Sequence, residues 1–323
     1  MHHSHLYGDC ILKIGTNRAL DPSCTADPPA SFAIRIADLT IALTCDDPML
    51  AVPPDGAMTP FLVREAEPDL RLQARWGKLG AVSGGEQLFE SGGLWRLDAQ
   101  NGSLRFSFTS PVLGPLPYKM ASLDKDFTSG EVLIHQPYFP PGRAVYPLEY
   151  PLDELFLIHL LAAGRGVEVH ACGVVDSSGQ GYLFAGQSGA GKTTMARLWQ
   201  KTEGAGGAGG LMILSDDRIV LRYQAGRFWM YGTPWHGEAE LSFPARAPLK
   251  GVYLLRHGTS NRLVALRRSA TVARLVACSF PLFYHTSGLD FTLGFLDQLV
   301  EAVPCYELSF TPDERVIALV RSS

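Results

Sequence analysis

The hydrophobic and polar positions change their pattern near the middle of the chain. From Ser31 to about Tyr138, apolar residues fall in short runs that alternate with polar residues or are rich in β-branched and aromatic side chains. Gly, Asp, Asn and Pro separate these runs, which is typical of strands joined by turns. The pattern predicts strands at Phe32–Ile36, Leu94–Leu97, Leu104–Phe108 and Glu131–His135.

After residue 151 helical and strand patterns alternate. Apolar residues at helical spacing predict a helix over Leu152–Gly164. The apolar run Val167–Val175 predicts a strand, and the turn Asp176–Gly181 joins it to a second strand at Tyr182–Ala185. The same reasoning predicts helices at Met195–Gln200, Thr271–Ala277 and Phe291–Val303, and strands at Leu211–Leu214, Ile219–Tyr223, Arg227–Tyr231, Gly251–Arg256, Tyr306–Phe310 and Val316–Val320.

The tract Gln136–Pro151 contains five prolines and is typical of a linker. We therefore predict two domains, a β-rich N-terminal domain over residues 1–150 and an α/β domain over residues 151–323. Residues 1 to about 30 are polar and Pro-rich toward their end, so we expect this start to be partly disordered. Five glycines within Gly204–Gly210 predict a flexible break inside the second domain.

Composition narrows the classes of function. Hydrophobic residues make up 46% of the 323 residues and charged residues 19%, which is typical of a globular protein with a substantial core. The formal net charge of -4 argues against a nucleic-acid partner, since such a partner requires a basic face. No run of apolar residues is long enough to span a bilayer. We therefore expect a soluble cytoplasmic protein without a membrane partner.

One segment carries a specific chemical pattern. Residues Gly186–Thr193 match the P-loop (Walker A) pattern G-x-x-x-x-G-K-[ST] at every fixed position, between an apolar strand and a helix. Glycines let backbone N–H groups surround phosphate oxygens, and the helix adds the positive end of its dipole. The lysine neutralises the β- and γ-phosphates, and the threonine hydroxyl is placed for Mg²⁺. ATP and Mg²⁺ are thus expected at Gly186, Gln187, Ser188, Gly189, Ala190, Gly191, Lys192, Thr193 and Thr194.

Two adjacent acids follow the next apolar strand along the chain. Asp216 and Asp217 come directly after Ser215, so their carboxylates can emerge beside the P-loop, as a Walker-B acid does. One of them can hold Mg²⁺ together with Thr193, directly or through water. The other can accept a proton from an attacking hydroxyl. The alternative is a solvated turn.

A histidine lies in the strand that precedes the P-loop hairpin. His170 is in the middle of Val167–Val175, and a tight turn would bring this strand alongside the one that feeds the loop. Its position makes it a candidate for the reaction centre. The alternative is a hydrogen-bonded histidine of the core, which is the commoner role of a lone strand histidine.

The order of these three features resembles the HPr kinase/phosphorylases and, more widely, the phosphoenolpyruvate carboxykinases. The similarity covers roughly Leu152–Tyr231. It implies a P-loop kinase domain of the HPr kinase/carboxykinase type with a mixed sheet, and a possible homo-oligomer, since HPr kinases form hexamers. It also implies that His170 is the active-site histidine, and that Asp216 and Asp217 are the metal-binding and base residues. The segments Gly232–Glu238 and Val252–Gly258 resemble divergent members, among them those that phosphorylate the tail of lasso peptides.

Four further residues are candidates for binding the acceptor. Trp235, His236 and Glu238 follow a strand and a Thr-Pro bend, where a loop could line an acceptor pocket. The alternative is a packed tryptophan corner with polar neighbours. Arg256 ends a strand and could clamp a phosphoryl oxygen, or it could form a surface ion pair.

The sequence thus predicts an ATP- and Mg²⁺-dependent kinase that transfers a phosphoryl group to a hydroxyl. Lys192, His170, Asp216 and Asp217 are the expected catalytic residues. The favoured acceptor is a Ser or Thr of a peptide or small protein. A free small molecule, such as an amino acid or a sugar, is the second alternative, and a nucleotide-gated regulatory protein without transfer is the third.

Overall fold

The computed structural model describes residues 30–51, 56–64, 67–203 and 210–323. The expected disordered start, at residues 1–29, and most of the expected glycine-rich break lie outside the described residues. The chain divides into two compact units. Unit 1 contains most of the described residues up to Glu149, and unit 2 contains Tyr150–Ser323 together with Ile34–Thr40 and residues 56–63. In the described part, no helix combines the length and the apolar composition needed to cross a membrane.

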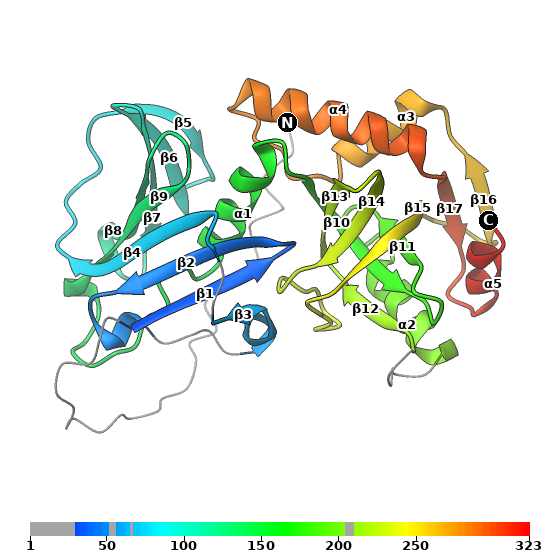
Figure 1. The fold of residues 1–323 in the computed structure, drawn as a ribbon, viewed down its shortest axis with the longest axis horizontal. Coiled ribbons are helices and arrows are strands. Elements are labelled where there is room, and N and C mark those ends of the chain that lie inside the picture. The colour runs from blue at the N-terminus through cyan, green and yellow to red at the C-terminus, as the bar shows by residue number, and fades with distance from the viewer. Residues whose placement is uncertain (1–29, 52–55, 65–66, 204–209) are drawn as a thin grey trace. The chain divides into compact units, whose positions relative to one another are not determined.

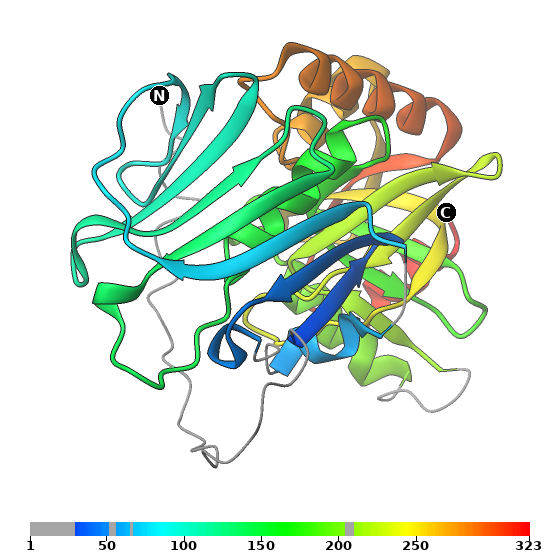
Figure 2. The same cartoon turned by 60° about the vertical axis from the view of Figure 1, so that its left-hand side comes forward.

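The first nine strands form one mixed sheet in the order β3-β1-β2-β4-β9-β8-β7-β6-β5 (Figures 1 and 2). The pairs β2–β4 and β4–β9 are parallel, and the pairs from β9 to β5 are antiparallel. The strands are β1 Ala30–Ile36, β2 Leu39–Cys45, β3 Leu62–Val63, β4 Leu70–Gly77, β5 Glu86–Glu90, β6 Trp95–Gln100, β7 Ser103–Ser110, β8 Gly114–Leu123 and β9 Ser129–His135. Short 3-10 helices lie at Pro48–Leu50, Gly56–Phe61 and Gln136–Tyr138.

All four strands predicted in this half occur, as β1, β6, β7 and β9, but others were missed. Strand β8 contains Pro115 and Pro117, which are unfavourable in a strand that is paired on both sides. Its pairing with β9 begins only at Lys119, and both prolines lie in the irregularity of the β7–β8 ladder between the pairs Phe108–Lys119 and Ser110–Gly114. This arrangement explains why the prolines are tolerated and why the sequence pattern concealed the strand.

Unit 2 contains a second mixed sheet in the order β11-β10-β13-β14-β15-β17-β16, with β12 paired to β10. Strand β11 also pairs with β15, so β10, β13, β14, β15 and β11 form a closed circuit of pairings. The strands are β10 Val167–Val175, β11 Gly181–Ala185, β12 Met212–Ser215, β13 Arg218–Gln224, β14 Arg227–Gly232, β15 Arg246–His257, β16 Arg262–Ala265 and β17 Cys305–Phe310.

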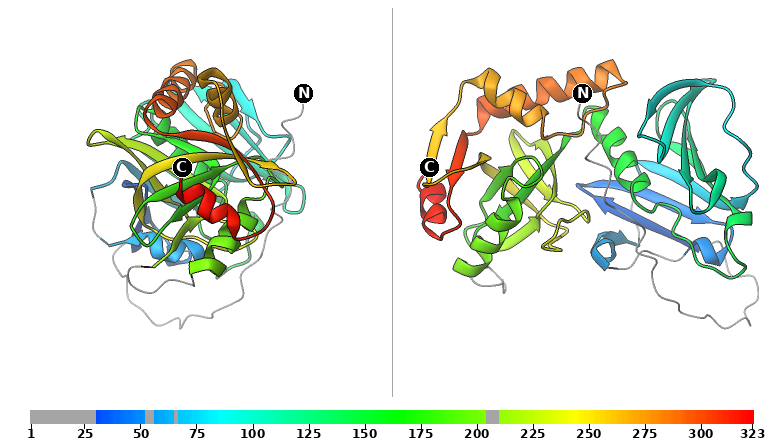
Figure 3. Two further views of the ribbon diagram at one scale, coloured as in Figure 1. Left: turned by 90° about the vertical axis from the view of Figure 1, so that its right-hand side faces the viewer. Right: turned by 180° about the vertical axis from the view of Figure 1, so that it is seen from behind.

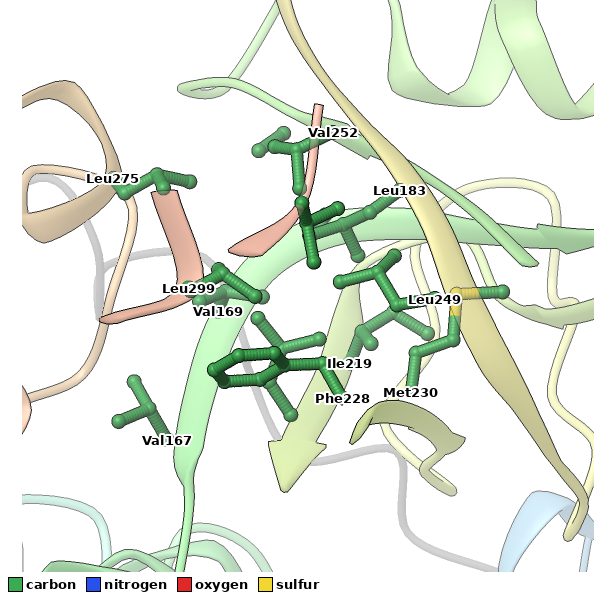
Figure 4. Close-up of a cluster of buried hydrophobic side chains, with 14 of the residues drawn as sticks. Val167, Val169, Leu183, Ile219, Phe228, Met230, Leu249, Val252, Leu275 and Leu299 are labelled. Carbon is green, nitrogen blue, oxygen red and sulfur yellow. The ribbon is translucent and has the colours of Figure 1, made fainter. Parts of the chain in front are cut away.

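Five helices pack against this sheet, namely α1 Leu152–Ala162, α2 Lys192–Glu203, α3 Arg268–Val276, α4 Thr286–Ala302 and α5 Arg315–Arg321. Strand residues such as Val169 and Ile219 form one apolar core with Leu275 of α3 and Leu299 of α4 (Figure 4). A second core joins α2 and α5 to strand residues such as Phe184. Figure 3 shows the two helices, α2 in green and α5 in red, near each other. The P-loop hairpin is therefore supported by packed side chains on both of its faces.

The C-terminal segment differs from the sequence prediction. We expected a strand at Val316–Val320 because the segment is rich in β-branched residues, but it forms helix α5. Val316, Ile317 and Val320 are all buried, and their spacing places them on one helical face. The Asp313 side chain accepts a hydrogen bond from the backbone N–H of Arg315 at 3.0 Å, which stabilises the first turn.

The turn between β10 and β11 is organised by a buried carboxylate. Asp176 Oδ1 accepts hydrogen bonds from the backbone N–H groups of Ser178 and Gln180, both at 2.9 Å, and Oδ2 accepts one from the Tyr182 hydroxyl at 3.1 Å. Burial favours the neutral acid, but these hydrogen bonds outweigh burial and lower the pKa of Asp176. The ionised carboxylate therefore stabilises the hairpin that delivers the chain into the P-loop.

We predict that Asp176→Ala lowers the free energy of unfolding by about 1–3 kcal/mol at neutral pH, because the hydrogen bonds that a charged acceptor makes within the turn are lost. Because the folded-state pKa is lowered, this stabilisation is present above the unfolded-state pKa and is lost as pH falls through the folded-state value. Urea unfolding at several pH values should show the deficit of the variant shrinking in acid. Ser177→Ala, an exposed change in the same turn, is the control and should match the parent.

Candidate functional site

The P-loop residues connect β11 directly to α2. Strand β11 ends at Ala185 and α2 begins at Lys192, so the loop is six residues long, Gly186–Gly191. Gly189 and Gly191 have φ angles of +78° and +103°, a region that side chains with a Cβ rarely adopt. A Cβ on Gly191 would also lie 2.7 Å from the Phe310 ring. The backbone of the loop thus requires glycine at these positions.

The P-loop lysine lies within the loop that carries it. Lys192 is 6% exposed, and its Nζ donates hydrogen bonds to the carbonyl oxygens of Gly186 at 3.0 Å and Gln187 at 3.2 Å. Burial lowers the pKa of Lys192, whereas the nearby Asp217 carboxylate raises it. The ammonium group and the first N–H groups of α2 concentrate positive charge at the loop, and Thr193 and Thr194 lie half-buried in the first helical turn.

Strand β10 pairs with β11, which leads into the P-loop, and with β12 and β13, which lie on either side of the two aspartates in the chain. The His170 carbonyl accepts a hydrogen bond from Gly186 N–H at 3.4 Å, and Ala171 N–H donates to the Asp217 carbonyl at 3.0 Å. His170 is also paired with Arg218 across the β10–β13 ladder. The structure therefore brings the histidine, the loop and the second aspartate together, although they are far apart in sequence.

The Asp217 carboxylate is held by charged or polar side chains at both oxygens. Oδ1 lies 2.7 Å from His170 Nε2, and Oδ2 accepts a hydrogen bond from Arg218 Nη1. Burial favours the neutral acid, but His170, Arg218 and Lys192 together lower the pKa of Asp217. Burial lowers the pKa of His170. At neutral pH the pair is thus an ionised carboxylate that accepts the Nε2 proton of a neutral imidazole.

The neighbouring Asp216 has a different environment. It is 1% exposed, and its carboxylate accepts hydrogen bonds from the backbone N–H groups of Gly237 at 2.9 Å, Ala239 at 3.0 Å and Leu241 at 3.4 Å. A Cβ on Gly237 would lie 2.8 Å from Asp216 Oδ2, so the loop backbone approaches closely. Three of the four lone-pair positions of this carboxylate are used by the loop. Asp216 therefore anchors the segment that contains three of the acceptor candidates.

The acceptor candidates Trp235, His236 and Glu238 lie on this loop, whereas Arg256 lies in β15. Trp235 is half-buried and its Nε1 donates to Asp153 Oδ2 at 3.3 Å, whereas His236 and Glu238 are exposed. Arg256 is 67% exposed and pairs with Glu307 Oε1 at 3.2 Å, which is the surface ion pair of the alternative prediction. Its neighbour His257 instead contacts the P-loop, with Nε2 2.8 Å from the carbonyl oxygen of Gly189.

The sequence reasoning missed a buried charged cluster behind Asp217. Arg218 Nε donates to Glu154 Oε1 at 2.8 Å and lies 4.0 Å from Glu168 Oε1, and the guanidinium stacks on the Phe280 ring at 4.4 Å. Glu154 belongs to α1, whose apolar spacing predicted only core residues. The signal in the sequence was the presence of acids inside two otherwise apolar elements, α1 and β10.

The described residues contain no group of three or more His, Cys, Asp and Glu side chains that could hold a metal ion by themselves. Mg²⁺ in nucleotide sites takes one or two protein oxygens and shares the remaining positions with phosphate oxygens and water. Thr193 offers a hydroxyl oxygen of this kind, and Asp216 offers the one lone-pair position that its three hydrogen bonds with the loop leave over. The donor set thus suits a cation bound together with a nucleotide.

No protein-family model and no curated protein sequence matches this chain. Among solved structures, the HPr(Ser) kinase/phosphatase from Coxiella burnetii is similar in part, with a TM-score of 0.26 and 10% sequence identity. The similarity covers 48% of this chain and 90% of that chain. A likeness at this level supports no inference about fold or function, so function is inferred from the site itself.

The two aspartates lead to a prediction that separates their roles. Asp216→Asn replaces one acceptor oxygen by an amide N–H₂ that faces backbone donors, so the free energy of unfolding should fall by about 1–3 kcal/mol. Hydrogen exchange at the amides of Gly237 and Ala239 should accelerate. Asp217→Asn is the matched control and should leave the protection of these amides close to that of the parent. Equal protection in both variants would show that Asp216 does not anchor the loop.

Proposed function

We propose that this protein is a kinase that uses ATP and Mg²⁺ to transfer the γ-phosphoryl group to a hydroxyl. The observation that supports it most directly is the burial of Lys192 in the P-loop beside the Asp217–His170 pair. A site with phosphate-binding groups alone would fit any nucleotide-binding protein. The ionised carboxylate next to the lysine adds a group that can orient and deprotonate an attacking hydroxyl. We infer a P-loop kinase domain of the HPr kinase/carboxykinase type.

The residues present fit a nucleoside triphosphate. The positive φ angles at Gly189 and Gly191 turn the loop backbone into a cradle for phosphate oxygens, and Lys192 would neutralise their charge. Thr193 and Asp216 would hold Mg²⁺ through their oxygens. When bound, Mg²⁺ neutralises the charge that develops on the β–γ bridge. Because Lys192 is shielded from water, its attraction for phosphate is stronger than that of a solvated lysine.

In the proposed reaction the acceptor oxygen forms a bond to the γ-phosphorus while the bond to the β–γ bridging oxygen breaks. Asp217 orients the acceptor hydroxyl and takes its proton, and His170 holds the carboxylate in place through Nε2. The lowered pKa makes Asp217 a weak base but keeps it ionised. In a loose transition state little proton transfer is needed early, so orientation contributes more than base strength.

The favoured acceptor is a Ser or Thr of a peptide or small protein. Support comes from the loop anchored by Asp216, on which His236 and Glu238 are exposed and half-buried Trp235 offers an apolar edge. An exposed loop of this kind suits an acceptor that extends beyond the reaction centre. A free amino acid or sugar is the alternative that the transfer experiment distinguishes.

We predict that Lys192→Ala abolishes transfer of a γ-labelled phosphoryl group from ATP. The assay uses an extract of the native host divided into small molecules, peptides and proteins, and the labelled fraction gives the acceptor class. Lys201→Ala is the matched control, since Lys201 is 74% exposed near the end of the same helix. Label from the control but not from Lys192→Ala supports the kinase. ATP binding without label in any fraction would favour a nucleotide-gated regulatory protein and contradict transfer.

A second prediction tests whether Asp217 is the base. Asp217→Asn keeps the side-chain shape but removes the negative charge, so ATP should still bind while the transfer rate falls by at least about 100-fold. Nucleotide affinity is measured by calorimetry and transfer by label incorporation. A variant that still transfers at a rate close to that of the parent would exclude Asp217 as the base. Loss of both binding and transfer would place it in nucleotide binding instead.

A further inference from the structure

We propose that Arg218, held by Glu154, is a positioning residue that fixes the orientation of Asp217 for phosphoryl transfer. This inference rests on the proposed function. Arg218 is 9% exposed at its side chain, and its guanidinium links two acids from different elements. Nη1 reaches Asp217 Oδ2 and Nε reaches Glu154 Oε1. The fork geometry of a guanidinium suits this bridge, because its N–H groups have fixed directions.

The backbone around Arg218 is equally constrained. Its N–H donates to Ser215 Oγ at 3.1 Å, and its carbonyl accepts a hydrogen bond from the Thr233 hydroxyl at 2.8 Å. The Phe280 ring lies against the guanidinium, with 4.4 Å between its centroid and Cζ. Arg218 therefore has little freedom to follow Asp217, and Asp217 must adopt the orientation that Arg218 and His170 together allow.

The two glutamates near Arg218 have unequal roles. Glu154 pairs with Nε directly, whereas Glu168 lies 4.0 Å from the same nitrogen and is fully buried. Burial and the adjacent Glu154 carboxylate raise the pKa of Glu168 well above its ordinary value. With Asp217 and Glu154 already balancing the cations, a third buried negative charge would lack compensation. The neutral form of Glu168 is therefore favoured, and its longer distance from Nε makes it the weaker partner of Arg218.

Loosening Arg218 should change the rate of transfer but not the binding of ATP. Arg218 reaches the Asp217 oxygen opposite the one that His170 holds, so the two donors fix the plane of the carboxylate. Neither Glu154 nor Arg218 belongs to the P-loop. Loosening the anchor should therefore lower kcat while the KM for ATP stays close to that of the parent. General destabilisation of the fold would instead lower the active fraction without this split.

The test compares Glu154→Gln with Glu168→Gln, two isosteric changes on either side of one guanidinium. Glu154→Gln should lower kcat by roughly 10- to 100-fold with little change in KM for ATP. Glu168→Gln should retain kcat within about twofold, because Glu168 lies 4.0 Å from Nε and forms no hydrogen bond with it. Equal kcat values in the two variants would overturn the inference.

Arg218→Ala keeps the proposal testable should Glu154→Gln fold poorly. Guanidinium ion at non-denaturing concentration should restore part of its transfer rate, whereas equal concentrations of ammonium should not. No rescue in a variant with the parent's circular dichroism and ATP affinity would count against a positioning role.

A direct probe of the pair separates this inference from the kinase proposal. The proton that joins His170 Nε2 to Asp217 gives an NMR signal whose position depends on the geometry of that hydrogen bond. The signal should be unchanged in Glu168→Gln and shifted or broadened in Glu154→Gln. If the parent protein transfers no phosphoryl group, the proposed function is wrong, and this signal still decides the inference. An unchanged signal in Glu154→Gln would overturn it.

Discussion

Strand β10 is hydrogen-bonded along both of its edges, and the positions of the side chains around the P-loop depend on this pairing. One edge binds β11, which leads into the P-loop, and the other binds the region of Asp217 and Arg218. Successive strand side chains point to opposite faces, so a slip by one residue would turn His170 away from Asp217. The apolar neighbours of His170 resist such a slip, because it would place His170 in the apolar core that Val169 and Ala171 fill.

The same burial makes the charged groups interdependent. The side chains of Lys192, His170 and Arg218 are buried, where water screens their charges little, and that of Asp217 is 24% exposed. Each charged group therefore depends on its neighbours for compensation. Asp217 offsets the cost of the two cations, and they in turn keep it ionised. A network of this kind is costly to assemble and rigid once assembled, which is the property that a phosphoryl-transfer site requires.

The parts of the site that follow from local patterns could be predicted from the sequence. The P-loop glycines and strands β10 and β11 depend on neighbours within a few residues. The structure has both strands where the sequence analysis predicts them. The bond between His170 and Asp217 joins residues 47 positions apart, and the bridge from Arg218 to Glu154 joins residues 64 apart. Such contacts depend on strand order and register, which hydrophobic periodicity does not encode. Helix α5 was mistaken for a strand because β propensity was weighed above the spacing of its buried residues.

Asp216 and Asp217 show the limit of motif reasoning most clearly, because in the sequence they are equivalent. At the end of β12 adjacent side chains point in opposite directions, so one carboxylate meets the backbone of the Gly237–Leu241 loop and the other meets His170 and Arg218. Backbone N–H groups hold the Asp216 carboxylate in place, whereas ionisable neighbours determine the charge of the Asp217 carboxylate. A pair of acids beside a P-loop therefore need not divide one metal ion between them. Here the geometry links the first acid to the loop that would receive an acceptor, and the second to the groups that would activate it.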